Sequence, residues 1–393
     1  MLSKYRILTL NEIAPKGLAL LPPDQYEVAS EFSDPDAILV RSANLHERPL
    51  NPRLKAIARA GAGVNNIPVN LCSQRGIAVF NTPGANANAV KELVLAGMLV
   101  AARNVCEAAA FVRALDVPAE RLADEVERAK KRFRGFELAG RTLGVIGLGA
   151  IGVRVANMAI ELGMTVIGYD PAISVRAAWQ LDSRVEQALS LESLLQQSDF
   201  VSLHVPLLDS TRHLINADRL AHMRTGSVLL NFSRGEIVDE AALEPALEQG
   251  APARYVSDFP SARLKGHPRV ISLPHLGAST EESEENCAVM AVQQLRDFLE
   301  RGTVHRSVNL PEVELGAIPE GAHRIAIVND NDAGMIAAMT RVLGEAKLNI
   351  EDMINRARDE LAYTLIDVTG PLADQALDAL RAVPGVRSVR VCH

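Results

Sequence analysis

The chain of 393 residues is poor in cysteine and in aromatic residues. Its four cysteines stand far apart, at positions 72, 106, 287 and 392, and none belongs to a CxxC pair. This spacing indicates neither a disulfide framework nor a zinc site, so we expect no metal and a reducing, cytoplasmic location. Aromatic residues make up only 4% of the chain, which argues against platforms for stacking nucleic-acid bases.

The chain also lacks an excess of positive charge and long apolar runs. Its net charge is −7, which argues against binding to nucleic acid or to a membrane surface. No stretch approaches 18 uninterrupted apolar residues, and the amino terminus has no apolar core followed by a small-residue cleavage site. We therefore expect no membrane span and no signal peptide. The length allows two to four domains.

A glycine-rich turn organises the middle of the chain. Residues 141–152 read RTLGVIGLGAIG, a short apolar run followed by glycines at 147, 149 and 152. In this GxGxxG spacing, Gly147 permits a tight turn, Gly149 lets the backbone approach a pyrophosphate, and Gly152 lets a helix pack close to the strand. The positive end of that helix then faces the phosphates. The pattern predicts a dinucleotide site.

An acidic residue follows the next apolar run at the spacing that this site requires. Residues 164–169 are apolar, and Asp170 comes 18 residues after Gly152. A carboxylate there accepts hydrogen bonds from an adenosine ribose and disfavours a 2′-phosphate. We therefore predict NAD rather than NADP as the cofactor.

Strands and helices alternate along most of the chain, which favours an α/β fold with doubly wound parallel sheets. We expect strands at 5–10, 37–41 and 56–60, a short strand before a helix that starts near Ala87, and helices across 100–134 with a break at Pro118. After the glycine turn, strands are expected at 142–146, 165–169, 200–205, 227–232, 253–257 and 270–273, followed by a long helix over 280–301.

The last part of the chain reads as a separate small unit. Residues 303–321 have little periodicity and two prolines, which indicates a linker with few contacts across it. Beyond it, the pattern predicts strands at 323–329, 350–357, 361–369 and 386–392, with helices at 334–347 and 373–383. The order βαββαβ is typical of a ferredoxin-like unit.

Several motifs in this order resemble those of the D-isomer-specific 2-hydroxyacid dehydrogenases, in particular members that carry a C-terminal ACT domain. The motifs are RSANL from Arg41, RAGAGVNNI from Arg59, NTPGANANAVKEL from Asn81, HVPLLDSTRHLIN from His204, NFSRGEIVDEAAL from Asn231 and PHLGAST from Pro274. The resemblance implies a Rossmann-type NAD-binding domain (86–275) inserted in a flavodoxin-like outer domain (1–85 and 276–302). A linker (303–321) and an ACT regulatory domain (322–393) follow.

The resemblance also implies the chemistry. It makes Arg234 the cation for the substrate carboxylate and His275 the group that takes the hydroxyl proton. It implies NAD-dependent oxidation of D-3-phosphoglycerate to 3-phosphohydroxypyruvate, the opening step of serine synthesis. Oxidation or reduction of another acid, such as 2-hydroxyglutarate, glyoxylate or hydroxypyruvate, and a non-catalytic NAD(H)-sensing scaffold remain as alternatives.

The same motifs assign candidate site residues. The cofactor is expected against Gly147, Gly149, Ala150, Ile151, Gly152, Asp170, His204, Val205, Pro206, Asn231, Ser233, Arg234, Asp258, His275 and Gly277. The substrate is expected against Arg41, Ser42, Gly61, Ala62, Gly63, Val64 and Asn86. An L-serine effector of the ACT domain is expected against Asn329, Asn331 and Asn349, in a homodimer or homotetramer.

The chain departs from the family at one position. The family places a glutamate between the arginine and the histidine, where it orients the histidine, but this chain has Ala262 there, or Arg263 beside it. No carboxylate occurs between Asp258 and Glu281. Asp258, Glu281 and Glu282 are the nearest acids, and the sequence does not choose among them.

Overall fold

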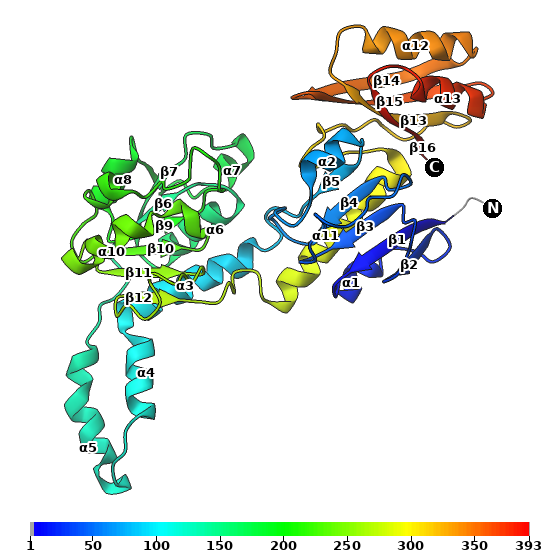
Figure 1. Cartoon of the computed structure of the whole chain (residues 1–393). Coiled ribbons are helices and arrows are strands. Elements are labelled where there is room, and N and C mark those ends of the chain that lie inside the picture. Colours follow the sequence, from blue (N-terminus) through cyan, green and yellow to red (C-terminus); the bar gives the residue numbers. More distant parts are fainter. Residues whose placement is uncertain (1–3, 393) are drawn as a thin grey trace. The chain divides into compact units, whose positions relative to one another are not determined.

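The computed structural model describes residues 4–392. They form two compact units: one runs to Asn86 and resumes at Glu281, and the other runs from Ala87 to Thr280 (Figure 1). Within the described part of the chain, no single helix is long and apolar enough to cross a membrane. Two helices joined at a bend, α3 (Ala87–Arg103) and α4 (Val105–Arg113), are long and apolar enough only when they are taken together.

The first unit is built on a five-stranded parallel sheet with the order β2-β1-β3-β4-β5. This 2-1-3-4-5 order is that of flavodoxin-like folds, as predicted. Its central strands are short buried runs, which suits strands covered on both faces. The strands are β1 (Tyr5–Leu10), β2 (Tyr26–Ala29), β3 (Ala37–Val40), β4 (Ala56–Arg59) and β5 (Ala78–Phe80), with short helices α1 (Pro15–Leu18) and α2 (Val69–Gln74).

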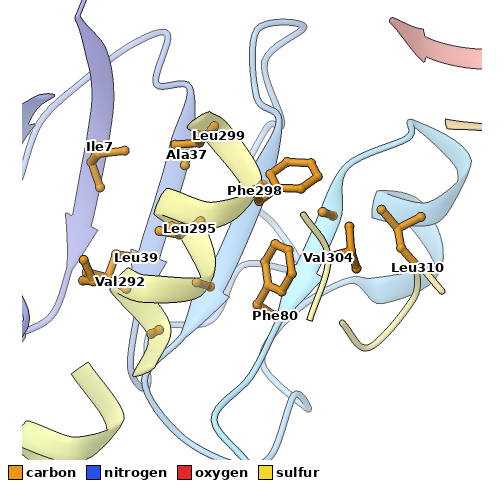
Figure 2. Close-up of a cluster of buried hydrophobic side chains, with 14 of the residues drawn as sticks. Ile7, Ala37, Leu39, Phe80, Val292, Leu295, Phe298, Leu299, Val304 and Leu310 are labelled. Carbon is orange, nitrogen blue, oxygen red and sulfur yellow. The ribbon is translucent and has the colours of Figure 1, made fainter. Parts of the chain in front are cut away.

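One long helix, α11 (Glu281–Arg301), covers a face of this sheet. It begins the second segment of the unit and leads to its C-terminal part. Its buried side chains Val292, Leu295 and Phe298 pack against strand residues that include Leu39 and Phe80 (Figure 2). The acids of its first turn and the arginine of its last turn suit the helix dipole. The sequence of α11 therefore fixes both its ends and its buried face.

The second unit is a seven-stranded parallel sheet with the order β12-β11-β10-β9-β6-β7-β8. Counted from β6, this is the 3-2-1-4-5-6 order of the Rossmann fold with one strand added, as predicted. The strands are β6 (Thr142–Ile146), β7 (Thr165–Tyr169), β8 (Glu186–Gln187), β9 (Phe200–Leu203), β10 (Val228–Asn231), β11 (Arg254–Ser257) and β12 (Val270–Ser272). The helices are α3, α6 (Ala150–Glu161), α7 (Val175–Gln180), α8 (Leu191–Gln197), α9 (Ala217–Leu220) and α10 (Glu240–Gln249), with a 3-10 turn η2 (Gly235–Ile237).

Two helices of the second unit stand apart from its sheet as a hairpin (Figure 1). They are α4 and α5 (Ala119–Ala129), followed by the 3-10 turn η1 (Lys130–Phe133). No residue of α4 is buried, and Val105, Val112 and Leu122 are each more than 40% exposed. The hairpin thus presents apolar side chains that nothing in the described chain covers.

The C-terminal part of the first unit is a four-stranded antiparallel sheet with the order β14-β15-β13-β16. Its elements are β13 (His323–Asp330), α12 (Met335–Glu345), β14 (Asn349–Arg358), β15 (Leu361–Thr369), α13 (Asp374–Arg381) and β16 (Val386–Cys392), which is the predicted βαββαβ order. Residues such as Ile325, Ile327 and Ile366 face the two helices. On the other face, Tyr363, Leu365 and Cys392 join the core around α11.

The expectation that few contacts cross residues 303–321 is wrong. Val304, Leu310 and Val313 belong to the core of the first unit, and Ser307 donates a hydrogen bond to the Val79 carbonyl (2.9 Å). Figure 2 shows Val304 and Leu310 beside Phe80. Composition alone misled because a short, irregular segment is buried here by partners that lie far away in the sequence.

The other strands, and the helices whose positions were predicted, agree with the sequence expectations to within a few residues at their ends. Two strands were missed, β2 and β8. β2 has a single buried residue and β8 has none, so neither carries an apolar pattern. Such strands are ordered by pairing with a neighbour rather than by their own sequence.

Candidate active site

The glycine turn of the second unit has the geometry that its spacing predicts. Gly147 has a φ of +91°, and a Cβ there would lie 2.7 Å from the His204 carbonyl oxygen. A Cβ on Gly152 would lie 1.9 Å from the Gly147 carbonyl oxygen, whereas one on Gly149 would meet nothing within 4 Å. Gly147 and Gly152 are thus required for packing, and Gly149 leaves open space in front of the backbone.

The helix that follows this turn begins at Ala150, so Ala150, Ile151 and Gly152 form its first turn. Its N-cap, Gly149, has no side chain to accept the first amide protons, which leaves them available to an anion. Asp170 comes directly after β7, and its carboxylate accepts the amide protons of Leu148 (2.8 Å) and Ala172 (2.9 Å). The acid is therefore anchored beside the glycine turn.

His204 closes the other side of the turn, at the end of β9. Its backbone amide donates to Ile146 (2.7 Å), and its Nε2 lies 2.8 Å from the Ser202 hydroxyl. Burial lowers the pKa of His204 to about 3, so the ring is neutral at physiological pH. Val205 and Pro206 continue from it into the loop that follows β9.

Asn231 builds the loop that presents Arg234. Its buried side chain donates to the Arg234 carbonyl (2.8 Å) and accepts from the Ser233 amide (3.1 Å), and the Ser233 hydroxyl donates to the Leu203 carbonyl (2.7 Å). The Arg234 guanidinium donates to the carbonyl of Ser233 (2.6 Å). No carboxylate among the described residues pairs with Arg234, so its charge is available to an anionic ligand.

Asp258 builds the turn that presents His275. Its buried carboxylate accepts the amide protons of Leu276 and Gly277, both at 2.7 Å, and its carbonyl accepts that of His275 (3.1 Å). These bonds hold His275 at a φ of +58°, a left-handed conformation that is uncommon outside glycine. The imidazole is exposed and lies against the Phe259 ring, with centroids 5.0 Å apart.

No carboxylate of the described second unit contacts the His275 imidazole. Ala262 is exposed, Arg263 pairs with Glu244 (2.9 Å), and the Asp258 carboxylate is taken up by two backbone amides. Glu281 and Glu282 begin α11 and belong to the first unit. The position that the family fills with glutamate therefore holds no acid in the second unit.

The candidate substrate residues of the first unit gather at the carboxyl ends of its strands, where ligands bind in open α/β sheets. Arg41 directly follows β3 and pairs with Glu284 in the first turn of α11 (2.5 Å), and Arg59 Nε donates to the Arg41 carbonyl (2.8 Å). The Ser42 amide donates to the Asn11 side chain (2.9 Å). This edge therefore carries two arginines, at the ends of the adjacent strands β3 and β4.

The loop Gly61–Val64 is fixed by the next strand. The Thr82 amide donates to the Gly61 carbonyl (3.0 Å), and the Asn81 side chain donates to the Ala62 carbonyl (2.6 Å). Gly63 and Val64 complete this loop. Asn86 has a buried side-chain oxygen with no hydrogen-bond partner among the described residues. A buried acceptor without a partner is costly, which suits a group that a ligand satisfies.

The three asparagines of the C-terminal sheet do not meet in one chain. Asn329 is buried and bonded to Asp330 and Thr364. It pairs with the first residues of β15, whereas Asn349 pairs with the last. These two ends are seven residues apart along β15, which corresponds to roughly 23 Å. Asn331 follows β13 and bonds to the Asp359 carbonyl (3.1 Å). A ligand touching both sets would need two copies of the chain.

Two residues at this edge were missed by sequence reasoning, Arg59 and Glu284. Arg59 stands directly before the glycine loop at the end of a strand, a position that could have marked it. Glu284 is one of four acids in EESEE and carries no signal of its own. No group of three or more metal-ligating side chains occurs in the described part of the chain.

Comparison with known proteins agrees with this geometry. Residues 95–277 match the family model described as D-isomer specific 2-hydroxyacid dehydrogenase, NAD binding domain. The open backbone at Gly149, the helix N-terminus behind it and the anchored Asp170 fit that cofactor, and the dinucleotide is NAD.

Curated relatives extend the similarity beyond this domain. D-3-phosphoglycerate dehydrogenase of Methanocaldococcus jannaschii is 37% identical over 73% of this chain and 54% of its own length, so the chain spans about half of that relative. The Haemophilus influenzae protein of the same name is 33% identical over 87% of this chain and 82% of its own. Hydroxypyruvate reductase of Thermotoga maritima is 34% identical over 75% and 98%.

A solved structure shows the same architecture. The NAD+-bound 3-phosphoglycerate dehydrogenase of Entamoeba histolytica superposes with a TM-score of 0.61 at 27% identity, covering 78% of this chain and 99% of that one. Together with the curated relatives, this match shows that the chain belongs to the D-isomer-specific 2-hydroxyacid dehydrogenase family.

Proposed function

We propose that the protein catalyses the NAD-dependent oxidation of D-3-phosphoglycerate to 3-phosphohydroxypyruvate, the first step of serine synthesis. The observation that carries this proposal is the pair of arginines, Arg41 and Arg59, at the substrate edge of the first unit. A 2-hydroxy acid with an uncharged tail needs one cation for its carboxylate, whereas a phosphorylated one needs a second cationic site. The names of the curated relatives support the same substrate.

In this reaction Arg234 binds the substrate carboxylate, since its planar fork matches two carboxylate oxygens and no acid of the described chain occupies it. His275 accepts the hydroxyl proton as C2 loses its hydride, because a neutral imidazole is a suitable base near neutral pH. Bound NAD supplies the hydride acceptor. The Asp258 turn holds His275 in place, and Asn231 holds the loop of Arg234.

We also propose a division of labour along the chain. Residues 86–275 bind NAD, residues 1–85 with 276–302 bind the substrate, and residues 322–393 form a regulatory ACT domain after the segment 303–321. The cofactor contacts proposed are those on the glycine turn, at Asp170, from His204 to Pro206, from Asn231 to Arg234, and at Asp258, His275 and Gly277. The substrate contacts proposed are Arg41, Ser42, Gly61–Val64 and Asn86.

Regulation and assembly follow as proposals of the same kind. L-serine binding between two ACT domains would use Asn329 or Asn331 of one copy and Asn349 of another, since these lie at opposite ends of the sheet in one chain. The exposed apolar side chains of the α4–α5 hairpin support a homodimer or homotetramer. A cytoplasmic location accords with four free cysteines among the described residues.

The test is NADH formation with D-3-phosphoglycerate, measured beside D-glycerate, D-2-hydroxyglutarate and D-lactate, and with NADP in place of NAD. We expect the phosphorylated acid to have the highest kcat/KM, and NAD to exceed NADP. Preference for an unphosphorylated acid would favour the second candidate, another 2-hydroxyacid dehydrogenase. NADH binding without turnover of any of these acids would favour a sensing scaffold, which is worth testing because no acid of the described second unit contacts His275.

A further inference from the structure

The side chain expected to bind the substrate phosphate already holds a carboxylate. Arg41 Nη2 donates to Glu284 Oε1 at 2.5 Å, and no other acceptor among the described residues is bonded to the Arg41 guanidinium. The two side chains are 39% and 40% exposed. A guanidinium has five N–H donors, so most of those of Arg41 remain for another anion.

The surroundings fix Glu284 at this spot. The neighbouring Glu285 pairs with Lys16 of α1 (2.8 Å), and α1 lies so close to α11 that a Cβ on Gly17 would be 2.7 Å from that of Ala288. On the other side, Arg59 holds the Arg41 backbone. The first turn of α11 is therefore clamped against the ends of β3 and β4, and Glu284 cannot leave the neighbourhood of Arg41 without a change of rotamer.

Glu284 cancels only part of the positive charge of this edge in the absence of substrate. Arg41 and Arg59 supply two positive charges close enough to lower the pKa of the Cys287 thiol, although burial raises it overall. Glu284 supplies a negative charge in direct contact. An incoming phosphate dianion meets an arginine that is already paired, with a like charge beside it.

We propose that Glu284 is a specificity-determining residue that competes with the substrate phosphate for Arg41 and so sets the affinity for phosphorylated substrates. This inference rests on the proposed function. A phosphate carries up to two charges and three acceptor oxygens and displaces the carboxylate from a half-exposed pair, because such a pair is weak. A substrate with an uncharged tail leaves the pair intact. After turnover, Glu284 returns to Arg41 and opposes rebinding of the phosphorylated product.

The experiment compares Glu284→Gln with wild type in the full-length enzyme. Glutamine keeps an acceptor for Arg41 but removes the charge. We expect the KM for D-3-phosphoglycerate and the inhibition constant of inorganic phosphate to fall about two- to five-fold, the range of a half-exposed ion pair. We expect kcat not to rise, and kcat/KM for D-glycerate, the same acid without its phosphate, to stay unchanged. Glu285→Gln is the matched control: it removes a neighbouring charge that does not contact Arg41, and because its pair with Lys16 is largely exposed, it should change these values less than about two-fold.

A double-mutant cycle makes the test specific to the pair. In an Arg41→Gln background, the added Glu284→Gln change should no longer lower either constant, because the shared partner is gone. An unchanged or raised KM in Glu284→Gln overturns the proposal and would make Glu284 a residue that orients Arg41 instead. The same holds if Glu284→Gln acts equally in the Arg41→Gln background.

The two proposals fail in different ways. Inorganic phosphate inhibition can be measured against whichever 2-hydroxy acid the enzyme oxidises. If D-3-phosphoglycerate is no substrate but phosphate inhibits more strongly in Glu284→Gln, the substrate assignment fails and the role of Glu284 stands. If D-3-phosphoglycerate is oxidised but inorganic phosphate inhibits neither enzyme and the KM does not fall, the role of Glu284 fails and the function stands.

Discussion

Two arginine–carboxylate pairs in the first unit differ in what surrounds them. Arg324 and Asp367, in the C-terminal sheet, are 0% and 2% exposed, and all five donors of Arg324 are used: two on Asp367 and three on the carbonyls of Arg301, Leu315 and Gly316. Arg41 and Glu284 are about 40% exposed and share one bond.

The difference in burial indicates which pair stabilises the fold and which one can bind a ligand. A buried arginine with every donor satisfied cannot exchange partners, so the Arg324 pair ties the C-terminal sheet to residues 301–316. A half-exposed pair with donors to spare can exchange one anion for another at low cost. Both pairs look alike in sequence, as an arginine and a distant acid.

The largest effect is expected from removing the part that the buried pair holds. Deleting residues 303–393 uncovers Phe80, Phe298 and Leu299, which Val304, Leu310 and Tyr363 cover in the intact chain. We expect the truncated protein to aggregate, as exposed core surface does. Soluble yield and the near-UV circular dichroism of the purified protein measure this. A well-folded, active truncation would show that the C-terminal sheet is a detachable module after all.

Breaking the buried pair itself should cost about 3–5 kcal/mol of unfolding free energy. Asp367→Asn leaves the Arg324 charge buried without its counterion, and urea unfolding measures the loss. The control is Arg324→Met with Asp367→Leu, which removes both charges and should destabilise less than either single change. A double variant that loses as much as Asp367→Asn would mean that the bonds from Arg324 to the three carbonyls, which only the double variant removes, contribute as much as the charge pair.

Arg234 extends the comparison to an arginine without a carboxylate partner in the described chain. Arg234→Ala should lower kcat/KM by the equivalent of about 2–5 kcal/mol, because it removes the proposed interaction with the substrate carboxylate. Stability and NADH affinity should change much less than kcat/KM, since among the described residues the Arg234 guanidinium donates to the Ser233 carbonyl alone and the proposed cofactor contact is shared with many other residues. Steady-state kinetics and NADH titration check both. Near-normal turnover would exclude the assigned role.

A buried histidine makes the stability of the second unit depend on pH. The pKa of His204 is about 3 in the folded chain and about 6.5 when unfolded. The unfolded state therefore binds more protons between these values, and the stability present above about pH 6.5 is lost as the pH falls. The loss should stay below about 1.4 kcal/mol per pH unit, because the folded and unfolded states differ by at most one proton on this ring. Urea midpoints from about pH 7.5 to 5.5 should fall less in His204→Asn.

The smallest effect concerns His275, which no acid of the described second unit contacts. Ala262→Glu introduces a carboxylate at the position that the family fills, and a carboxylate beside an imidazole favours the protonated ring. The pH midpoint of oxidation should then rise moderately, because the base must be neutral to accept the proton. pH profiles of turnover in both directions test this, with Arg263→Gln as a neighbouring control. Superimposable profiles would mean that residue 262 does not face the histidine.

The sequence by itself determined the local features of this protein. Gly147 and Gly152 are required by contacts within a few residues or with the adjacent strand. The apolar runs of β6, β7, β13 and β15 predict that these strands are buried. The order of strands and helices then allowed only doubly wound sheets and a βαββαβ unit. The resemblance of the motifs supplied Arg234 and His275 as candidates for the catalytic roles.

Only the tertiary structure decided which distant groups meet. Arg41 and Glu284 are 243 residues apart, and the irregular segment around Leu310 is buried by strands from the start of the chain and from its end. Composition gives no sign of either, because burial and pairing depend on what the fold brings alongside rather than on the segment's own periodicity. For the same reason, the sequence does not show whether an arginine is buried in a structural pair, as Arg324 is, or half-exposed with donors available to a ligand, as Arg41 is.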